Sequence, residues 1–249
     1  MDGRLTVRIG IGGWTYEPWR GVFYPDGLVQ RRELEYAAQH LTAIEINATF
    51  YGRQKPASWR KWGEAVPEGF QFTVKASRYS TARKVLAEGA DSIEKFLNQG
   101  FTELGDKLGP ILWQFAPTKH FERDDFARFL DLIPDSQDGV ALRHALEIRH
   151  ESFADPTFFE LARTRNMAVV FADSDEYPCI DEATADFSYA RLQRTEESVE
   201  TGYDNKSLDA WADKARRWSK GGRDAYVFFI AGAKVRNPTA ARMLIKRMI

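Results

Sequence analysis

The sequence predicts an α/β fold, namely a single (β/α)8 barrel of the TIM type over residues 1–249. Segments with β-like alternation and segments with helical spacing follow one another almost throughout, which is typical of parallel strands joined by right-handed crossovers. The length of 249 residues suits one such barrel. Polar or charged residues stand near the ends of successive apolar segments, where barrels carry their active-site groups. Together these observations favour a closed barrel over an open doubly wound sheet.

Eight segments have the composition and alternation of buried strands. They are residues 8–14, 43–50, 70–76, 111–115, 145–149, 168–173, 187–193 and 225–231. Helical spacing is found between most of them. The expected helices are residues 31–40, 57–65, 91–104, 124–133, 156–165, 208–219 and 239–248. Residues 174–186 lack a helical pattern, so we expect the barrel to be irregular between its sixth and seventh strands.

Capping residues and prolines mark the starts of several expected helices. Asp155 followed by Pro156 has the pattern of an N-cap and a first-turn proline. Ser207 stands directly before the helix expected at 208–219. Asn237 and Pro238 precede the last helix. These signals support the helix assignments independently of hydrophobic spacing.

Side-chain alternation assigns the two faces of each strand. In the second strand Ile44 and Ile46 point to one face, while Glu45 and Asn47 point to the other. Because the outer face of a barrel strand contacts helices, we expect the apolar set outside and the polar set towards the barrel axis. The same reasoning places a group of charged or amide side chains at one mouth of the barrel: Glu45, Asn47, Lys75, Gln114, Glu147, Arg149, Asp173 and Arg191.

The three acids of this group are the candidate catalytic residues. Carboxylates in unequal surroundings can have pKa values far apart, so that one serves as acid and another as base. This hypothesis assigns catalysis to Glu45, Glu147 and Asp173. Paired carboxylates also suit glycoside hydrolysis, in which their separation decides the stereochemistry. A structural alternative is that the acids form buried ion pairs that serve the fold alone.

The remaining members of the group are candidates for ligand binding. Lys75, Arg149 and Arg191 are placed to hold negative charge, and Asn47 and Gln114 are placed to orient the ligand. The cations equal the candidate acids in number. The sequence therefore favours a site without metal or other cofactor.

A divalent metal is the alternative to a metal-free site. Carboxylates and a histidine from different strands can ligate one. The candidate ligands are Glu45, Glu147, His150 and Asp173. A position beneath a loop, with a hydrogen bond to that loop, is an equally good interpretation of His150.

Two further groups of residues extend the expected site. Gly232, Lys234 and Arg236 follow the last strand and precede a helix start, which is the place where barrels often bind an anion. The alternative is a basic, solvated loop. Trp14 and Tyr51 belong to aromatic clusters after the first two strands and would stack on a sugar or base, or pack the loops onto the barrel.

Composition limits the partners and the compartment. The chain has 35 Lys and Arg against 36 Asp and Glu, a formal net charge of −1, and these charges are spread along its length. Nothing in this balance indicates nucleic-acid or membrane-surface binding. We find neither a signal peptide nor an apolar segment long enough to span a bilayer. The chain has one cysteine, Cys179, which excludes an intramolecular disulfide, so we expect a cytoplasmic protein. The polar group at the barrel mouth leads us to expect a small polar or anionic ligand as its partner.

Several runs of residues carry a family resemblance. They are GIGGW at 10–14, WRGVFYP at 19–25, EINATFY at 45–51, FTVK at 72–75, LGPILWQF at 108–115, EIRHESF at 147–153, ADS at 172–174 and YARL at 189–192. With these runs the chain resembles the YecE-like family, catalogued as domain of unknown function 72, from end to end. The resemblance implies a (β/α)8 barrel, but the family has no established reaction.

The chain departs from the family pattern at three loops. It has STA at 80–82 where the family tends to have a histidine, and QR at 193–194 where the family tends to have His-Gly. It has IAG at 230–232 in place of an asparagine-rich turn. The resemblance therefore implies altered specificity or loss of activity in this chain.

These observations lead to one main functional hypothesis and two alternatives. The main hypothesis is an enzyme that acts by acid–base chemistry on a small polar, anionic or sugar-like ligand at the C-terminal mouth of the barrel. The first alternative is a divalent-metal-dependent isomerase or phosphodiesterase. The second is a protein that binds a metabolite or nucleic acid without catalysis. The sequence gives no indication of the oligomeric state.

Overall fold

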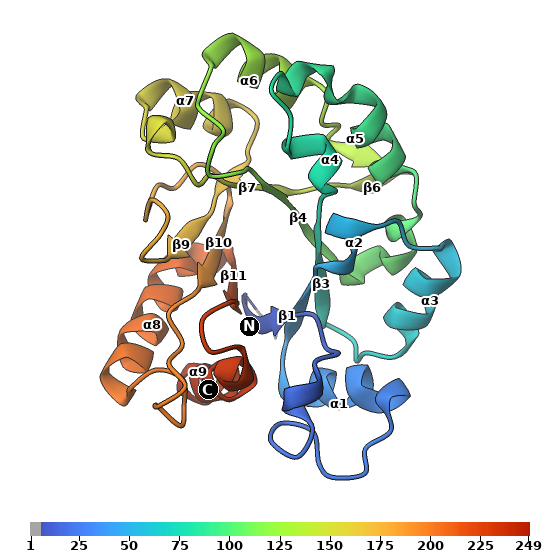
Figure 1. The fold of residues 1–249 in the computed structure, drawn as a ribbon, viewed down its shortest axis with the longest axis vertical. Helices are drawn as coiled ribbons and strands as arrows, with labels where there is room; N and C mark the ends of the chain where they lie inside the picture. Colours follow the sequence, from blue (N-terminus) through green and yellow to red (C-terminus); the bar gives the residue numbers. More distant parts are fainter. Residues whose placement is uncertain (1–5) are drawn as a thin grey trace.

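The computed structural model describes residues 6–249. Within this range nine parallel strands form a nearly closed barrel that is surrounded by helices (Figure 1). The barrel strands in chain order are β1 Val7–Gly12, β2 Ala43–Ile46, β3 Gln71–Lys75, β4 Leu108–Gln114, β7 His144–Glu147, β8 Ala168–Val169, β9 Phe171–Asp173, β10 Phe187–Leu192 and β11 Asp224–Phe229. A short antiparallel pair, β5 Ser136–Gln137 and β6 Val140–Ala141, lies apart from the barrel sheet. The α/β class and the barrel expected from the sequence are confirmed.

The first and last barrel strands pair with each other. β1 runs parallel to β11 with Val7 opposite Ala225 and Ile11 opposite Phe229. β1 also pairs with β2 on its other side. Strands from opposite ends of the described chain therefore lie side by side in the sheet.

The least regular part of the ring is the segment that contains β8 and β9. β8 pairs with β7, β9 pairs with β10, and only Val170 separates the two strands along the chain. The amide of Val170 still donates to the carbonyl oxygen of Leu146 at 3.0 Å. The strand expected at 168–173 is thus divided into two, and the expected count of eight strands is not confirmed. Residues 174–186 contain no helix, as their pattern indicated.

Helices connect most of the strands and cover the outside of the barrel (Figure 1). They are α1 Glu33–His40, α2 Ala48–Tyr51, α3 Pro56–Glu64, α4 Arg78–Thr81, α5 Ala90–Leu97, α6 Arg123–Asp131, α7 Pro156–Thr164, α8 Asn205–Trp218 and α9 Asn237–Met248. Within residues 6–249, every helix is too short or too polar to cross a membrane. The seven expected helices are all found, whereas the sequence pattern did not indicate the short helices α2 and α4.

Two helix boundaries differ from the expected ones for local reasons. The helix expected at 91–104 ends at Leu97, because Gly100 has a left-handed backbone with φ +86° and a 3-10 segment, Phe101–Lys107, follows. α8 begins before Ser207, because Asp204 is the N-cap and its carboxylate accepts from the Ser207 amide at 2.7 Å. Asp155 caps α7 as expected, with its side chain accepting from the Thr157 amide.

The side-chain alternation of the strands separates an inner from an outer apolar core. The inner core fills the barrel: Ala43, Leu112, Ala145, Ala168, Val170, Phe187, Tyr189, Tyr226 and Phe228. Ile44 and Ile46 belong to the outer core between strands and helices, as their alternation with Glu45 indicated. The interior of the barrel is therefore filled in its middle, and a ligand inside the ring of strands has room only at its ends.

His144, at the start of β7, is a buried histidine with both ring nitrogens engaged. Its Nδ1 accepts from Trp113 Nε1 at 3.1 Å, and its Nε2 lies 3.0 Å from the carbonyl oxygen of Pro134. Burial lowers the pKa of His144 to about 4. Below pH 6.5 the unfolded chain binds a proton here that the folded protein does not bind until about pH 4, so stability falls as the pH drops through this window.

We expect His144 to contribute a stability loss of roughly 3 kcal/mol between pH 7 and pH 4. Urea unfolding of the wild type and of His144→Gln at both pH values measures this contribution. The variant should lose less stability on acidification than the wild type. An equal loss in the two proteins would show that other groups cause the acid sensitivity.

Candidate functional site

A buried arginine joins two glutamates at the C-terminal ends of the barrel strands. The Arg191 guanidinium donates to both oxygens of Glu45, with Nη2 3.1 Å from Oε1 and Nε 3.2 Å from Oε2. Its Nη1 pairs with Oε2 of Glu147. The exposed fraction is 2% for Arg191 and 0% for both glutamates. We call these three residues the Arg191 cluster; they come from β10, β2 and β7, which alternation alone had placed together.

The Glu147 carboxylate accepts further hydrogen bonds from two residues that the sequence assigned to the site. Gln114 Nε2 donates to Oε2 at 2.9 Å, and Arg149 Nε donates to Oε1 at 2.9 Å. Arg149 lies beyond the end of β7, and its guanidinium stacks 4.2 Å from the ring centroid of Tyr177. Tyr177 belongs to the irregular segment 174–186, so this loop reaches the mouth of the barrel.

The Glu45 carboxylate accepts a further hydrogen bond from a tyrosine that was not assigned to the site from the sequence. Tyr189 donates its hydroxyl to Glu45 Oε2 at 2.7 Å, and the same hydroxyl lies 2.9 Å from Thr73 Oγ1. Burial and the charge of Glu45 raise the pKa of Tyr189 well above its usual value, so the hydroxyl keeps its proton. Tyr189 precedes Arg191 by two residues in β10, and this shared parity was the signal that could have identified it.

The cations of the mouth decide the protonation state of Glu147. Burial by itself raises the pKa of this carboxyl, but the positive charges of Arg191, Arg149 and Lys75 and the hydrogen bond from Gln114 outweigh it and lower the pKa to about 2. Burial lowers the pKa of Arg191, whereas the two glutamates raise it by more, so the net shift is upward. Glu147 is therefore ionised at neutral pH and holds no proton to give to a ligand.

Lys75 is the cation of the mouth that remains without a counter-ion. It ends β3, its exposed fraction is 8%, and its Nζ lies 4.2 Å from the ring centroid of Phe50. Within residues 6–249 its ammonium makes neither an ion pair nor a hydrogen bond. Burial, followed by the charge of Arg191, lowers the pKa of Lys75 to about 8, although Glu45 and Glu147 oppose the shift. A substantial fraction of this amine is neutral near physiological pH.

Asn47 lies beside the Arg191 cluster but not on the strand. β2 ends at Ile46, and Asn47 takes the N-cap position of the short helix α2, with its Nδ2 donating to the Glu45 carbonyl oxygen at 3.3 Å. A Cβ atom on Gly12 would lie 2.8 Å from this Nδ2. The glycine at the end of β1 therefore leaves the space that the Asn47 side chain occupies.

The structure does not bring Asp173 into the Arg191 cluster. Its Oδ2 accepts from the Tyr203 hydroxyl at 2.8 Å, and its Oδ1 lies 3.4 Å from Nη1 of Arg194. Phe171, two residues earlier on the same face, packs against Trp211 and Trp218 of α8. Asp173 thus faces the helix layer, and the inward orientation expected from the sequence was wrong.

The alternative metal ligands are not gathered at one point. His150 Nδ1 lies 2.9 Å from Ser152 Oγ, and its ring lies against His120 with centroids 3.8 Å apart. Asp173 faces Tyr203, and the two glutamates contact Arg191. Across residues 6–249, no three His, Cys, Asp or Glu side chains are grouped so that they could hold a metal ion. The ligand set proposed from the sequence is therefore not assembled.

The two aromatic residues assigned to the site lie in different surroundings. Trp14 is half-buried between Phe72 of β3 and Trp62 of α3, with ring centroids 6.2 and 5.1 Å away. It contributes to packing of the first loop onto the helix layer. Tyr51 is 69% exposed at the end of α2, where it lines a pocket at the rim of the barrel.

The residues of the expected anion site do not converge. Gly232 has φ +54°, and a Cβ atom there would lie 2.6 Å from Thr195 Oγ1, so tight packing against the neighbouring loop requires this glycine. Lys234 Nζ stacks 4.2 Å from the ring centroid of Tyr16, and Arg236 donates to the Glu197 carbonyl oxygen. These contacts fit the alternative interpretation of a basic loop that packs onto its neighbours.

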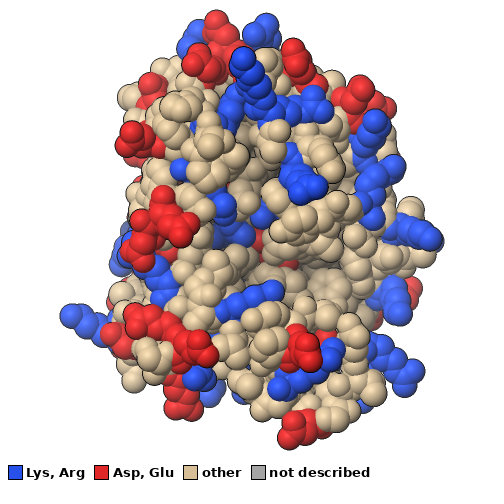
Figure 2. Space-filling model, in the orientation of Figure 1, with Lys and Arg blue, Asp and Glu red and all other residues tan. Residues whose placement is uncertain are grey.

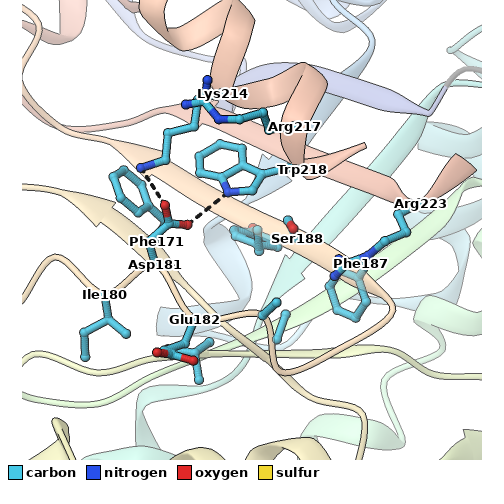
Figure 3. A pocket seen from close by; sticks show the side chains of 14 residues that line it. Phe171, Ile180, Asp181, Glu182, Phe187, Ser188, Lys214, Arg217, Trp218 and Arg223 are labelled. Atoms are coloured by element: carbon cyan, nitrogen blue, oxygen red, sulfur yellow. Dashed lines mark hydrogen bonds and ion pairs between the residues drawn. The ribbon is translucent and has the colours of Figure 1, made fainter. Parts of the chain in front are cut away.

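A separate cavity of about 250 Å³ lies on the outer side of the barrel, where the segment 174–186 replaces a crossover helix. Figure 3 shows Lys214 and Trp218 of α8 pointing towards Asp181 of this segment, with an ion pair of 2.9 Å and a hydrogen bond of 3.1 Å. None of the residues assigned to the site from the sequence lines this cavity. The ion pair and the hydrogen bond of Asp181 join the loop to α8, and the cavity lies apart from the mouth.

The chain matches a known protein family. The family described as "Protein of unknown function DUF72" matches residues 8–249. The chain belongs to the DUF72 family. A curated relative, the UPF0759 protein YunF of Bacillus subtilis (strain 168), is 28% identical over 159 residues, which cover 62% of this chain and 54% of that protein. The chain thus aligns with about half the length of this relative, and the resemblance stated from the sequence motifs is confirmed.

Solved DUF72 structures have the same fold. A DUF72 protein from Thermotoga maritima MSB8 superposes with a TM-score of 0.77 at 22% identity, over 98% of this chain and 99% of that one. A DUF72 protein from Enterococcus faecalis V583 gives a TM-score of 0.77 at 18% identity, over 97% and 95% of the two chains. At these identities the likeness establishes the fold, and the DUF72 name assigns no activity.

Proposed function

We propose that this DUF72 protein binds a small anionic or sugar-like compound at the C-terminal mouth of its barrel, and that Lys75 transfers a proton to or from that compound. The observation that carries the proposal is the buried Lys75 amine without a counter-ion, whose pKa is lowered to about 8. A catalytic base is most effective when its pKa lies near the working pH. The proposal moves the acid–base role from the glutamates to the lysine.

The surroundings of Lys75 support an anionic ligand. Two carboxylates, Glu45 and Glu147, face three cationic side chains at the mouth: Lys75, Arg149 and Arg191. Hydrogen bonds hold the charged groups of the Arg191 cluster in one arrangement. These groups therefore need no rearrangement when a ligand binds above them. The excess positive charge favours a carboxylate or phosphate group. Figure 2 shows the face of the molecule hollowed near its centre, with basic side chains beside the hollow.

The proposed reaction class is proton abstraction from carbon next to a carbonyl group. Deuterium uptake from D2O, followed by NMR, measures this step without knowledge of the natural product. We would use pyruvate, dihydroxyacetone phosphate and ribose 5-phosphate as probes. The wild type should accelerate exchange in at least one probe, with a rate that rises as the pH increases through about 8.

Lys75→Gln should slow this exchange at least about a hundredfold when measured at saturating probe, where any loss of affinity no longer affects the rate. Lys206→Gln, which alters an exposed lysine of α8, is the matched control and should exchange like the wild type. Equal exchange by the wild type and Lys75→Gln would contradict the proposal. Binding of a probe without exchange by the wild type would favour the non-catalytic alternative.

We propose that this chemistry proceeds without a metal. His150 and Asp173 lie away from the two glutamates, and both glutamates form ion pairs with Arg191. Elemental analysis of protein purified without chelator, with wild type and Glu147→Ala compared, tests this point. About one equivalent of a divalent metal in the wild type that is lost in the variant would favour the isomerase or phosphodiesterase alternative.

We also infer that the barrel is of the (β/α)8 type, with β8 and β9 acting as one interrupted strand. The single residue between them and the hydrogen bond from Val170 to Leu146 support this count. We also propose a cytoplasmic location for the protein. The single cysteine of the sequence, Cys179, is exposed and free, which supports this location.

A further inference from the structure

A second pocket lies at the rim of the barrel, between α2 and the helices α4 and α5. Its volume is about 320 Å³, which is within the range of small-molecule sites. Tyr51, Arg53, Tyr79, Arg83 and Lys95 are among its lining residues, and we call it the rim pocket. It adjoins the proposed site through Thr49, which lines the pocket and donates to the Lys75 carbonyl oxygen at 2.6 Å.

The rim pocket carries positive charge that no acid neutralises. Arg53 donates to the Asn98 carbonyl oxygen, and Arg83 donates to neutral oxygens of Tyr79, Glu88 and Ser92. The ammonium of Lys95 has no partner within residues 6–249. No Asp or Glu is found among the described residues that line the pocket. Since the whole chain has a net charge of −1, this local excess does not follow from composition.

Two exposed tyrosine rings border the same pocket. Tyr51 is 69% exposed and Tyr79 is 57% exposed, which makes them the most exposed aromatic side chains that the structure describes. The guanidinium of Arg78 lies 5.1 Å from the Tyr79 ring centroid and donates to the Tyr79 hydroxyl at 3.2 Å. The Tyr51 ring packs against Phe50 with centroids 5.2 Å apart. Each ring thus contacts a neighbouring side chain while much of its surface meets water.

Exposed aromatic rings beside cations that have no acidic partner match the two parts of a nucleotide. Aromatic side chains stack on a base whatever its hydrogen-bonding pattern, and Arg and Lys bind phosphate oxygens by charge-assisted hydrogen bonds. Figure 2 shows several Lys and Arg side chains over the region of α2, α4 and α5. We propose that the rim pocket binds a mononucleotide, with its base on Tyr51 and its phosphate near Arg53, Arg83 and Lys95.

Isothermal titration calorimetry with AMP tests the proposal, with adenosine and inorganic phosphate as matched probes. AMP should bind at least about tenfold more tightly than either part alone, and increasing salt should weaken it. No binding of AMP, or equal affinity for AMP and adenosine, would overturn the proposal. A 5′-phosphorylated tetranucleotide that binds more than about tenfold tighter than AMP would also overturn it, because the pocket would then receive the end of a nucleic acid.

Paired variants separate the contributions of ring and charge. Tyr51→Ala should weaken AMP binding about tenfold, whereas Tyr51→Phe, which keeps the ring, should bind within about twofold of the wild type. Lys95→Glu should weaken binding at least about tenfold. Lys206→Glu makes the same charge change on α8, across the barrel in Figure 1, and should have no effect. Unchanged binding in both Tyr51→Ala and Lys95→Glu would place the nucleotide elsewhere.

Discussion

Replacement of Arg191 by methionine is expected to lower the free energy of unfolding by about 3–5 kcal/mol at pH 7. Arg191 is the shared partner of Glu45 and Glu147, and all three side chains are buried. The variant removes the ion-pair partner of Glu45 and leaves Glu147 with Arg149 alone. Methionine has a similar length, so loss of packing is kept small. Urea unfolding followed by circular dichroism measures the difference.

The pH dependence of this loss identifies its cause. Arg191 contributes to the lowered pKa of Glu147, so protonation of Glu147 in the variant should shrink the difference between wild type and Arg191→Met as the pH is lowered towards 4. Arg32→Met removes the arginine of an exposed ion pair with Glu35 and should change stability little. A loss of less than about 1 kcal/mol for Arg191→Met would mean that the cluster is not a network of buried charges.

Replacement of Lys75 by methionine is expected to act in the opposite direction and to stabilise the protein by about 2–3 kcal/mol at pH 6–7. Burial lowers the pKa of Lys75 from 10.5 to about 8, so the folded protein holds this charge less readily than the unfolded chain does. Below pH 8 the folded state carries the full cost of the buried charge. Methionine fills the same space beside Phe50 without that cost. A cost in stability of this kind is compatible with the role proposed for Lys75.

The gain from Lys75→Met should depend on pH in a defined window. Between pH 8 and pH 10.5 the unfolded chain binds a proton at Lys75 that the folded protein does not bind, so wild-type stability rises with pH and the advantage of the variant disappears. Lys107→Met is the matched control. Lys107 donates to the carbonyl oxygens of Gly63 and Val66 at 2.6 and 2.8 Å, so this change should destabilise the protein. Destabilisation by Lys75→Met at pH 6 would contradict the assignment of Lys75 as an uncompensated buried charge.

Strand alternation was sufficient to predict the centre of the mouth. Glu45, Glu147 and Arg191 lie far apart in the sequence, yet each occupies an inward position near the end of an apolar strand, and the structure brings them into contact. Alternation indicates only the face of a side chain. It could not reveal that both glutamates bind one arginine, which leaves Lys75 as the residue with a perturbed pKa near neutrality.

The sequence did not predict the orientation of side chains whose position depends on packing outside the strands. Phe171 packs against the tryptophans of α8, and this contact turns Asp173, two residues later, away from the barrel axis. The polarity of Asp173 indicated a site residue, but its parity with Phe171 indicated the helix layer. The loop residues Trp14 and Lys234 were assigned from their places after the first and last strands, whereas contacts between distant segments decide their positions.

The pairing of β1 with β11 has a consequence for biosynthesis. β1 leaves the ribosome well before its partner β11, which is made only after more than 200 further residues, with Val7 finally opposite Ala225. Until then the outer edge of β1, with the apolar side chains of Ile9 and Ile11, has no strand beside it. An unpaired edge of this kind is open to chaperones and to other nascent chains. Translation of β11 therefore closes this edge of β1 and removes one route to misassembly.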